Sequence, residues 1–233
     1  MNSMKSGMHP RFAMAVKIMV AAVAMTASAM ASAQTARTWM VKGGYNNIQP
    51  DVSSGNMSAS SLPGTKADAG SASNLTVTVA YMFTDNISAE LCLGLPHKHD
   101  VTGDGAIKGS GKIGTVEALP PTLLAQYRFL SPKSAFRPYV GLGLSYAMFQ
   151  KETGSATLTA LTNPGGTPTT FSVDSAWGVS AQVGASYAFN EKWFADLSLI
   201  KTYLKTATHF SSGQNLDMRL DPLAVSVTVG YRF

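Results

Sequence analysis

The side chains of this chain that are best suited to chemistry are three histidines that follow residue 33: His97, His99 and His209. His97 and His99 are two positions apart, so on an extended strand their imidazoles share one face, and Asp100 adds a neighbouring carboxylate. Such a set could bind a metal ion weakly, but two or three ligands make a poor site. The sequence has no CxxC or HExxH motif. We therefore expect no metal centre and no cofactor.

Serine is abundant near these histidines, which would suit nucleophilic catalysis. A catalytic serine needs a base within hydrogen-bond distance, and no spacing in the sequence marks such a pair. Cys92 is the only cysteine, so the chain has no internal disulfide. We predict that the protein is not an enzyme.

Five charged residues beside short turns form a second candidate set. They alternate with apolar residues, so strands would aim them at one common side; they are Glu90, Arg128, Arg137, Asp196 and Arg232. In a narrow interior, opposite charges should form ion pairs and hydrogen bonds. Two interpretations stay open: these charges stabilise the interior, or they also plug it.

Strands with a two-residue period are the elements that would position these side chains. The pattern is clearest at the C-terminus, where the apolar set is Leu223, Val225, Val227, Val229, Tyr231 and Phe233. The residues between them are small or polar. Because side chains alternate between the two faces of a strand, one face meets an apolar phase and the other does not.

The same alternation recurs in eight segments. They are residues 37–48, 74–83, 87–95, 117–129, 135–150, 174–189, 193–206 and 218–233. Short turns alternate with long segments rich in Gly, Ser, Thr and Pro; the long segments are 49–73, 96–116, 151–173 and 207–217. This layout predicts an all-β fold, an eight-stranded antiparallel up-and-down transmembrane β-barrel with short periplasmic turns and long extracellular loops.

A soluble lipocalin-like barrel or a sandwich is the alternative fold, with the apolar face turned inward. The opposite face of these strands carries Gly, Ser and Thr together with Arg128, Arg137, Asp196 and Arg232, which would make a poor soluble core. Aromatic residues also gather beside the short turns, as in the girdle at a membrane interface. These features favour the membrane barrel, and they place the five charges in the lumen on its periplasmic side.

The first 33 residues have the pattern of a secretory signal peptide. Lys5, Arg11 and Lys17 precede or begin an apolar stretch, and the small residues of Ala31-Ser32-Ala33 offer a cleavage site. We expect residues 1–33 to be removed and residues 34–233 to form the barrel. The chain has 18 Lys and Arg against 13 Asp and Glu, and three of those bases but no acid lie before residue 34. The remainder therefore carries only +2, which does not indicate nucleic-acid binding.

Several stretches of this sequence resemble the outer membrane protein W (OmpW) family. They are Leu95-Pro96-His97-Lys98-His99-Asp100, Leu119-Pro120-Pro121-Thr122-Leu123 running into Gln126-Tyr127, Arg137-Pro138-Tyr139-Val140-Gly141-Leu142-Gly143, and the ending from Leu220-Asp221-Pro222 through Gly230-Tyr231-Arg232-Phe233. The resemblance implies a monomeric eight-stranded barrel of the cell outer membrane with an apolar channel for small hydrophobic molecules. It also implies a constriction by side chains of the third and seventh strands, where Cys92 and Ile200 stand.

Alternation assigns apolar residues to the inward face away from the periplasmic charges. The expected channel lining is Met40, Cys92, Leu124, Phe149, Ile200 and Leu204. Pro120 and Pro121 enter the fourth strand without N–H donors, so they mark either a lateral gap or a distortion of the rim. The functional alternative is a barrel without transport, serving envelope stability or acting as a surface receptor.

The partners expected for such a barrel follow from its surfaces. The outward face should contact outer-membrane lipids and lipopolysaccharide, and the lumen should bind small hydrophobic solutes. The C-terminal strand ending in Phe233 should be read by the barrel-assembly machinery. We expect no nucleic-acid partner and a monomeric protein.

Overall fold

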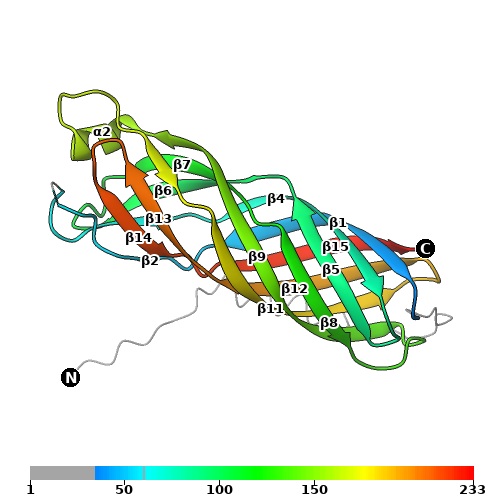
Figure 1. The fold of residues 1–233 in the computed structure, drawn as a ribbon. Helices are drawn as coiled ribbons and strands as arrows, with labels where there is room; N and C mark the ends of the chain where they lie inside the picture. Colours follow the sequence, from blue (N-terminus) through cyan, green and yellow to red (C-terminus); the bar gives the residue numbers. More distant parts are fainter. Residues whose placement is uncertain (1–34, 60) are drawn as a thin grey trace, which may run out of the picture. The chain divides into compact units, whose positions relative to one another are not determined.

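The computed structural model describes residues 35–59 and 61–233, and the predicted signal peptide, residues 1–33, lies outside them (Figure 1). Eight antiparallel strands close a barrel, each paired with the next along the chain. They are β1 (Trp39–Gln49), β4 (Ala72–Met82), β5 (Ile87–Gly94), β8 (Thr122–Arg128), β9 (Phe136–Gly154), β11 (Ala176–Ala188), β12 (Trp193–Tyr203) and β15 (Leu223–Arg232). Strand β15 returns to β1, with Met40 opposite Arg232 and Gln49 opposite Leu223. The predicted fold is confirmed.

The barrel has its apolar face outside. On β15, Val227 and Val229 are each 50% exposed, whereas Thr228 between them is buried. In a soluble barrel the valines would be inside, so this arrangement requires a surrounding apolar phase. Aromatic rings contact each other on the outward surface beside the short turns, as in the pairs of Tyr231 with Trp193 and with Phe233.

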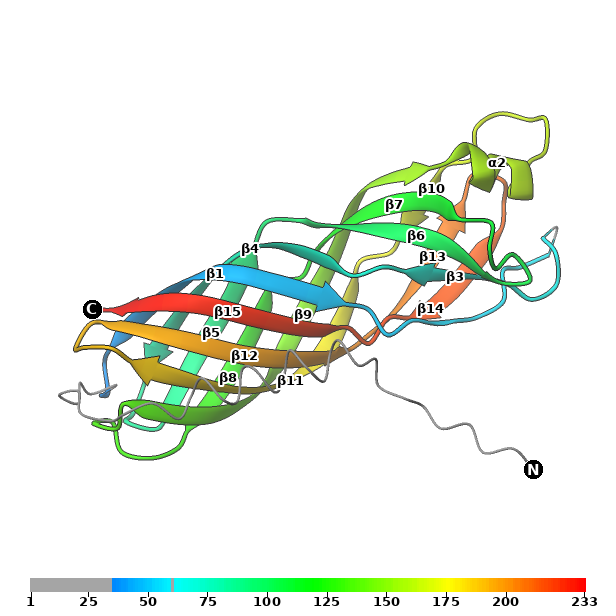
Figure 2. The same cartoon turned by 180° about the vertical axis from the view of Figure 1, so that it is seen from behind.

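The long segments between barrel strands are ordered, although no periodicity predicted this. They contain β2 (Ser53–Ser54), β3 (Thr65–Ala69), β6 (His97–Gly105), β7 (Lys112–Leu119), α2 (Ala156–Thr162), β10 (Phe171–Val173), β13 (Lys205–Phe210) and β14 (Asn215–Arg219). One set extends the barrel wall in the order β9-β7-β6-β3, and the other forms a separate sheet, β10-β13-β14-β2. Figure 2 shows both beyond the end of the barrel that lies opposite the C-terminus. Pairing within these segments satisfies backbone groups that open loops would leave to solvent.

Three of the predicted strands are each divided into two in the structure. The predicted strand 117–129 is divided, because Pro120 and Pro121 separate β7 from β8. The predicted strands 193–206 and 218–233 are also interrupted. β12 ends at Tyr203, and β15 begins only after Asp221, whose φ is 30°, and Pro222. Among the residues that the structure describes, no helix is long and apolar enough to cross a membrane.

Candidate functional site

The barrel and its extracellular extension enclose a cavity of about 140 Å³. At one end it is lined by Lys42, Glu90 and Asp196, and at the other by apolar residues that include Leu158 and Phe210. We call the charged end the floor and the apolar end the roof. Most of the side chains between them are apolar or are small hydroxyl residues. The cavity therefore suits a small molecule of largely apolar surface.

Lys42 is the centre of the floor. Its Nζ lies 2.7 Å from Oε2 of Glu90 and 3.0 Å from Oδ1 of Asp196, and all three side chains are almost completely buried. The sequence interpretation named both acids but missed the lysine. The signal was present, since Lys42 has the same strand parity as the inward Met40. Without it the two buried carboxylates would lack their closest cation.

Neutral side chains donate further hydrogen bonds to the two floor carboxylates. The hydroxyl of Tyr139 donates to Oδ1 of Asp196 at 2.9 Å, and Nε2 of Gln182 donates to Oε1 of Glu90 at 3.1 Å. Tyr139 stands on β9 and Gln182 on β11, so the network joins opposite walls of the barrel. Sequence reasoning missed both residues, because an uncharged inward side chain does not stand out in a polar lumen.

Arg128 joins the floor as its second cation. Its Nη2 lies 3.9 Å from Oε2 of Glu90 and donates to Oε1 of Gln126 at 2.9 Å. Its guanidinium carbon also lies 4.5 Å from the centroid of the Tyr139 ring. Charge-assisted bonds of this kind, fully screened from water, make the floor a rigid polar layer.

The other two predicted plug residues occupy different positions. Arg137 donates to the backbone oxygens of Asp85 at 2.8 Å and Phe129 at 3.2 Å, and so ties together two short turns. The guanidinium carbon of Arg232 lies 4.8 Å from the centroid of the Phe194 ring. The floor network therefore includes Glu90, Arg128 and Asp196 from the predicted set, while Arg137 and Arg232 fill the barrel nearer its periplasmic turns.

Four of the six residues expected to line the channel do line the cavity: Cys92, Phe149, Ile200 and Leu204. Met40 and Leu124 point inward but lie outside the lining. Met40 is completely buried in an apolar cluster with Met82 and Phe194, on the periplasmic side of Lys42. Leu124 pairs across strands with Glu90, at the level of the floor, and is likewise completely buried. Alternation gives the face of a residue, but not its height relative to the floor.

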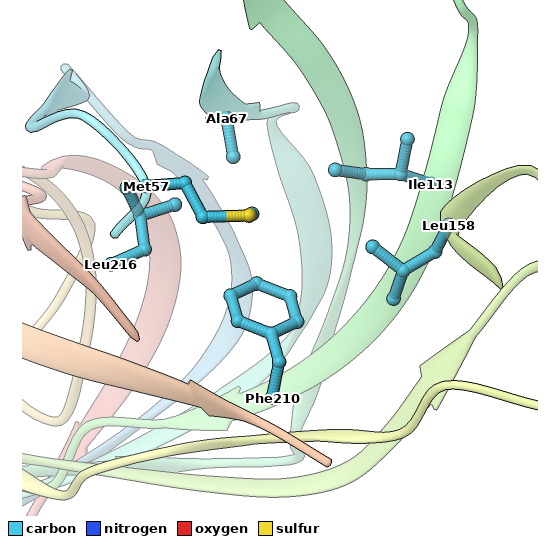
Figure 3. Packing of buried hydrophobic residues seen from close by; sticks show 6 residues of the cluster. All are labelled: Met57, Ala67, Ile113, Leu158, Phe210 and Leu216. Atoms are coloured by element: carbon cyan, nitrogen blue, oxygen red, sulfur yellow. The ribbon is translucent and has the colours of Figure 1, made fainter. Parts of the chain in front are cut away.

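The roof is a cluster of six buried residues from six different segments. Figure 3 shows them turned toward one another; they are Met57, Ala67, Ile113, Leu158, Phe210 and Leu216. Helix α2 contributes Leu158, which is 1% exposed. The side chain of Ser155 caps the helix by accepting a hydrogen bond from the backbone N–H of Leu158 at 3.2 Å. The cap fixes the first turn of the helix and with it the position of Leu158.

His97 and His99 line the cavity between floor and roof. Both are on the inward face of β6 and are 2% and 4% exposed, whereas Lys98 between them is exposed. The sequence interpretation placed them in outer loops or strand tops and did not foresee their burial. Burial lowers the pKa of both imidazoles, which favours their neutral form. In the described part of the chain, no three potential ligands gather as a metal site.

The barrel wall is interrupted beside the cavity. The β5–β8 ladder ends at Cys92 opposite Thr122, and pairing resumes only in the β6–β7 ladder at His97 opposite Ala118. Within the described chain, no backbone hydrogen bond joins residues 93–96 to residues 119–121. The backbone N–H of Leu95 instead donates to the backbone oxygen of Leu75 on β4, so the segment that follows β5 bonds to β4 and not to β8. Missing N–H groups at the prolines account for the interruption.

The similarity of this chain to known proteins extends over the whole barrel. A sequence model of the OmpW family matches residues 36–233. Outer membrane protein W of Vibrio cholerae is 33% identical over 92% of this chain and 97% of its own length. The dibenzothiophene metabolism operon protein PahQ of Pseudomonas aeruginosa is 30% identical, over 84% of this chain and 88% of its own. The crystal structure of OprG from Pseudomonas aeruginosa superposes with a TM-score of 0.78 at 28% identity, covering 86% of this chain and 98% of that one.

Proposed function

Because this chain belongs to the OmpW family of outer-membrane proteins, we propose that it carries small hydrophobic molecules from the cell exterior into the outer membrane. The observation that carries the proposal is the cavity, which is mostly apolar and is bounded on its periplasmic side by a layer of buried charges. Transfer of an apolar solute from water to such a surface lowers its free energy. A barrel with a purely structural role has no need of that space.

The floor supports a path that does not continue to the periplasm. An apolar solute moving past Lys42, Glu90 and Asp196 would have to separate buried ion pairs without replacing their interactions, which costs several kcal/mol. An eight-stranded barrel is also too narrow for an aqueous bypass. The floor therefore directs a solute out of the lumen by another route.

The interrupted wall supplies that route. Gly94 and Pro120 line the cavity on either side of the interruption. On the outward surface, Leu93, Gly94 and Leu95 also line a shallow hollow among lipid-facing residues. We propose that a solute passes between β5 and β8 into the bilayer. Apolar side chains on both sides would keep it out of water along this step.

The likeness to PahQ supports an aromatic solute. That relative is named for an operon of dibenzothiophene metabolism. A volume of about 140 Å³ is close to the roughly 150 Å³ engineered apolar cavity that binds benzene in another protein. Small aromatic molecules are therefore the first candidates for cargo.

Uptake by whole cells tests the proposal. Cells with and without the protein would be given a panel of short alkanes and single-ring aromatics, and the rate of intracellular accumulation would be measured. We expect the protein to increase uptake of apolar solutes and to leave uptake of a polar sugar unchanged. Equal uptake in the two strains would instead support the alternative of a structural or receptor barrel.

A pair of aspartate variants tests the sidedness of the path. Ile200 lines the cavity and is 7% exposed, whereas Val227 faces outward. Ile200→Asp should lower uptake while the barrel still inserts, because a carboxylate in the cavity repels an apolar solute. Val227→Asp should lower the amount of folded barrel, because its charge meets lipid. Normal uptake by a folded Ile200→Asp barrel would count against the cavity as the path.

Restoring the missing backbone donors tests the lateral route. Replacing Pro120 and Pro121 together with valine supplies two N–H groups that can extend the strand pairing. We expect slower uptake with unchanged folding. Pro138→Val, in a continuous part of β9, is the matched control and should leave uptake unchanged. Uptake by the double variant at the rate of the control would show that this interruption is not the exit.

A further inference from the structure

The histidines of the cavity wall carry an inference about which molecules it selects. Nε2 of His97 lies 3.3 Å from the backbone oxygen of Asn46. A carbonyl oxygen only accepts, so Nε2 must carry the proton, and in the neutral ring Nδ1 then presents a lone pair. The imidazole also lies against the backbone of Leu95, but this Nδ1 is buried and makes no hydrogen bond among the described residues.

A second unpartnered acceptor lies on the neighbouring residue. The side-chain oxygen Oδ1 of Asn46 is also buried without a partner in the described part of the chain, and Asn46 lines the cavity together with His97. His99 follows the same rule, since its Nδ1 lies 2.7 Å from the backbone oxygen of Gly70 and must donate there. The ring nitrogens that remain are therefore acceptors.

Buried acceptors in an apolar wall favour a particular ligand. An unpaired buried acceptor costs free energy, which a ligand donor would recover and a hydrocarbon would not. The low pKa that burial gives His97 keeps its lone pair available at neutral pH. A charged ammonium would meet mostly apolar surface instead, so the complementary donor is neutral.

We infer that the cavity selects neutral single-ring molecules that carry one hydroxyl or N–H group, which donates to His97 or Asn46 while the ring contacts the apolar wall. Phenols and small aromatic amines have this chemistry. The inference rests on the proposed function for the identity of the cavity as the solute path. It adds that one polar group on an otherwise apolar solute improves binding.

The test compares p-cresol with p-xylene, which have the same shape and differ in a hydroxyl against a methyl group. The folded barrel is placed in phosphatidylcholine nanodiscs, and equilibrium binding of each probe is measured relative to empty nanodiscs. We expect His97→Phe to weaken p-cresol binding by about 3- to 10-fold, the usual worth of one hydrogen bond. Binding of p-xylene should stay within about twofold.

Two further variants serve as controls. His97→Gln keeps an acceptor in the wall and should retain part of the preference for p-cresol. Lys98→Gln changes the neighbouring exposed residue on the outward face of β6 and should alter neither affinity. If the His97 variants fail to fold, the imidazole nitrogen resonances of the unaltered protein provide the measurement. Added p-cresol should shift the His97 Nδ1 signal, and p-xylene should not.

The outcomes separate this inference from the proposed function. Equal affinities of the unaltered barrel for the two probes, an equal loss of both in His97→Phe, or a His97 signal unmoved by p-cresol would overturn the selectivity. Selective binding in nanodiscs without protein-dependent uptake by cells would uphold the inference and count against transport. Protein-dependent uptake by cells without selective binding in nanodiscs would support transport and overturn the inference.

Discussion

At the scale of single residues, the floor shows how one missed lysine determines the electrostatics of the lumen. Glu90 and Asp196 stand on different strands, and Lys42 is the cation that contacts both. Arg128 balances the set, so the four charges sum to zero inside the barrel. A neutral, hydrogen-bonded network tolerates burial that a single charge would not.

Removing that lysine should destabilise the barrel strongly. Lys42→Met leaves two buried carboxylates with one cation, and we expect the free energy of unfolding to fall by about 3–5 kcal/mol. Urea unfolding of the lipid-inserted barrel measures the change. The double variant Lys42→Met with Glu90→Gln restores neutrality and should recover part of the loss. A single variant within about 1 kcal/mol of the unaltered protein would show that the floor does not depend on Lys42.

At the scale of elements, the closing seam between β1 and β15 depends on a close backbone approach. A Cβ added to Gly44 would lie 2.2 Å from the backbone oxygen of Val227 and 2.7 Å from Cα of Thr228. Neither contact can be relieved by turning a side chain. The neighbouring Gly43 has open space around the same position. The two glycines therefore have different roles on one strand.

Alanine substitutions should distinguish these two glycines. Gly44→Ala forces the paired strands apart, and we expect it to lower the free energy of unfolding by about 1–3 kcal/mol. Gly43→Ala meets no neighbour and should change it by less than about 0.5 kcal/mol. Thermal loss of heat-modifiable mobility on gels compares them. Equal stability of the two variants would contradict the tight seam.

At the scale of the whole molecule, the barrel closes on itself without an unpaired edge in its membrane part. Each of its eight strands has a partner on both sides, apart from the interruption between β5 and β8. A closed wall needs no second copy to satisfy its backbone. The apolar outer surface is covered by lipid, which also gives no reason for self-association.

We therefore predict a monomer, and the signal-peptide pattern of residues 1–33 predicts that the mature chain begins at Gln34. Native mass spectrometry of the protein released from outer membranes measures both properties at once. We expect one mass, that of residues 34–233 as a monomer. A mass that includes residues 1–33 would contradict cleavage, and a doubled mass would contradict the monomer.

The alternation of side chains was sufficient to predict the barrel and its sidedness. A strand places successive side chains on opposite faces, so the pattern of Leu223 to Phe233 determines which residues meet lipid without any knowledge of their neighbours. The same local rule placed Glu90, Arg128 and Asp196 inside. It also located the interruption at Pro120 and Pro121, because a missing N–H is a property of the residue itself.

Only the tertiary structure decided which inward residues meet. Lys42 and Asp196 are 154 positions apart, and their contact depends on the registers of β15 with β1 and with β12. The roof gathers six residues from segments that have no period, and His97 is buried in the cavity wall between that roof and the floor. Local pattern specifies the face of a residue, whereas height in the barrel and contact across it arise from closure of the sheet, which no short stretch of sequence contains.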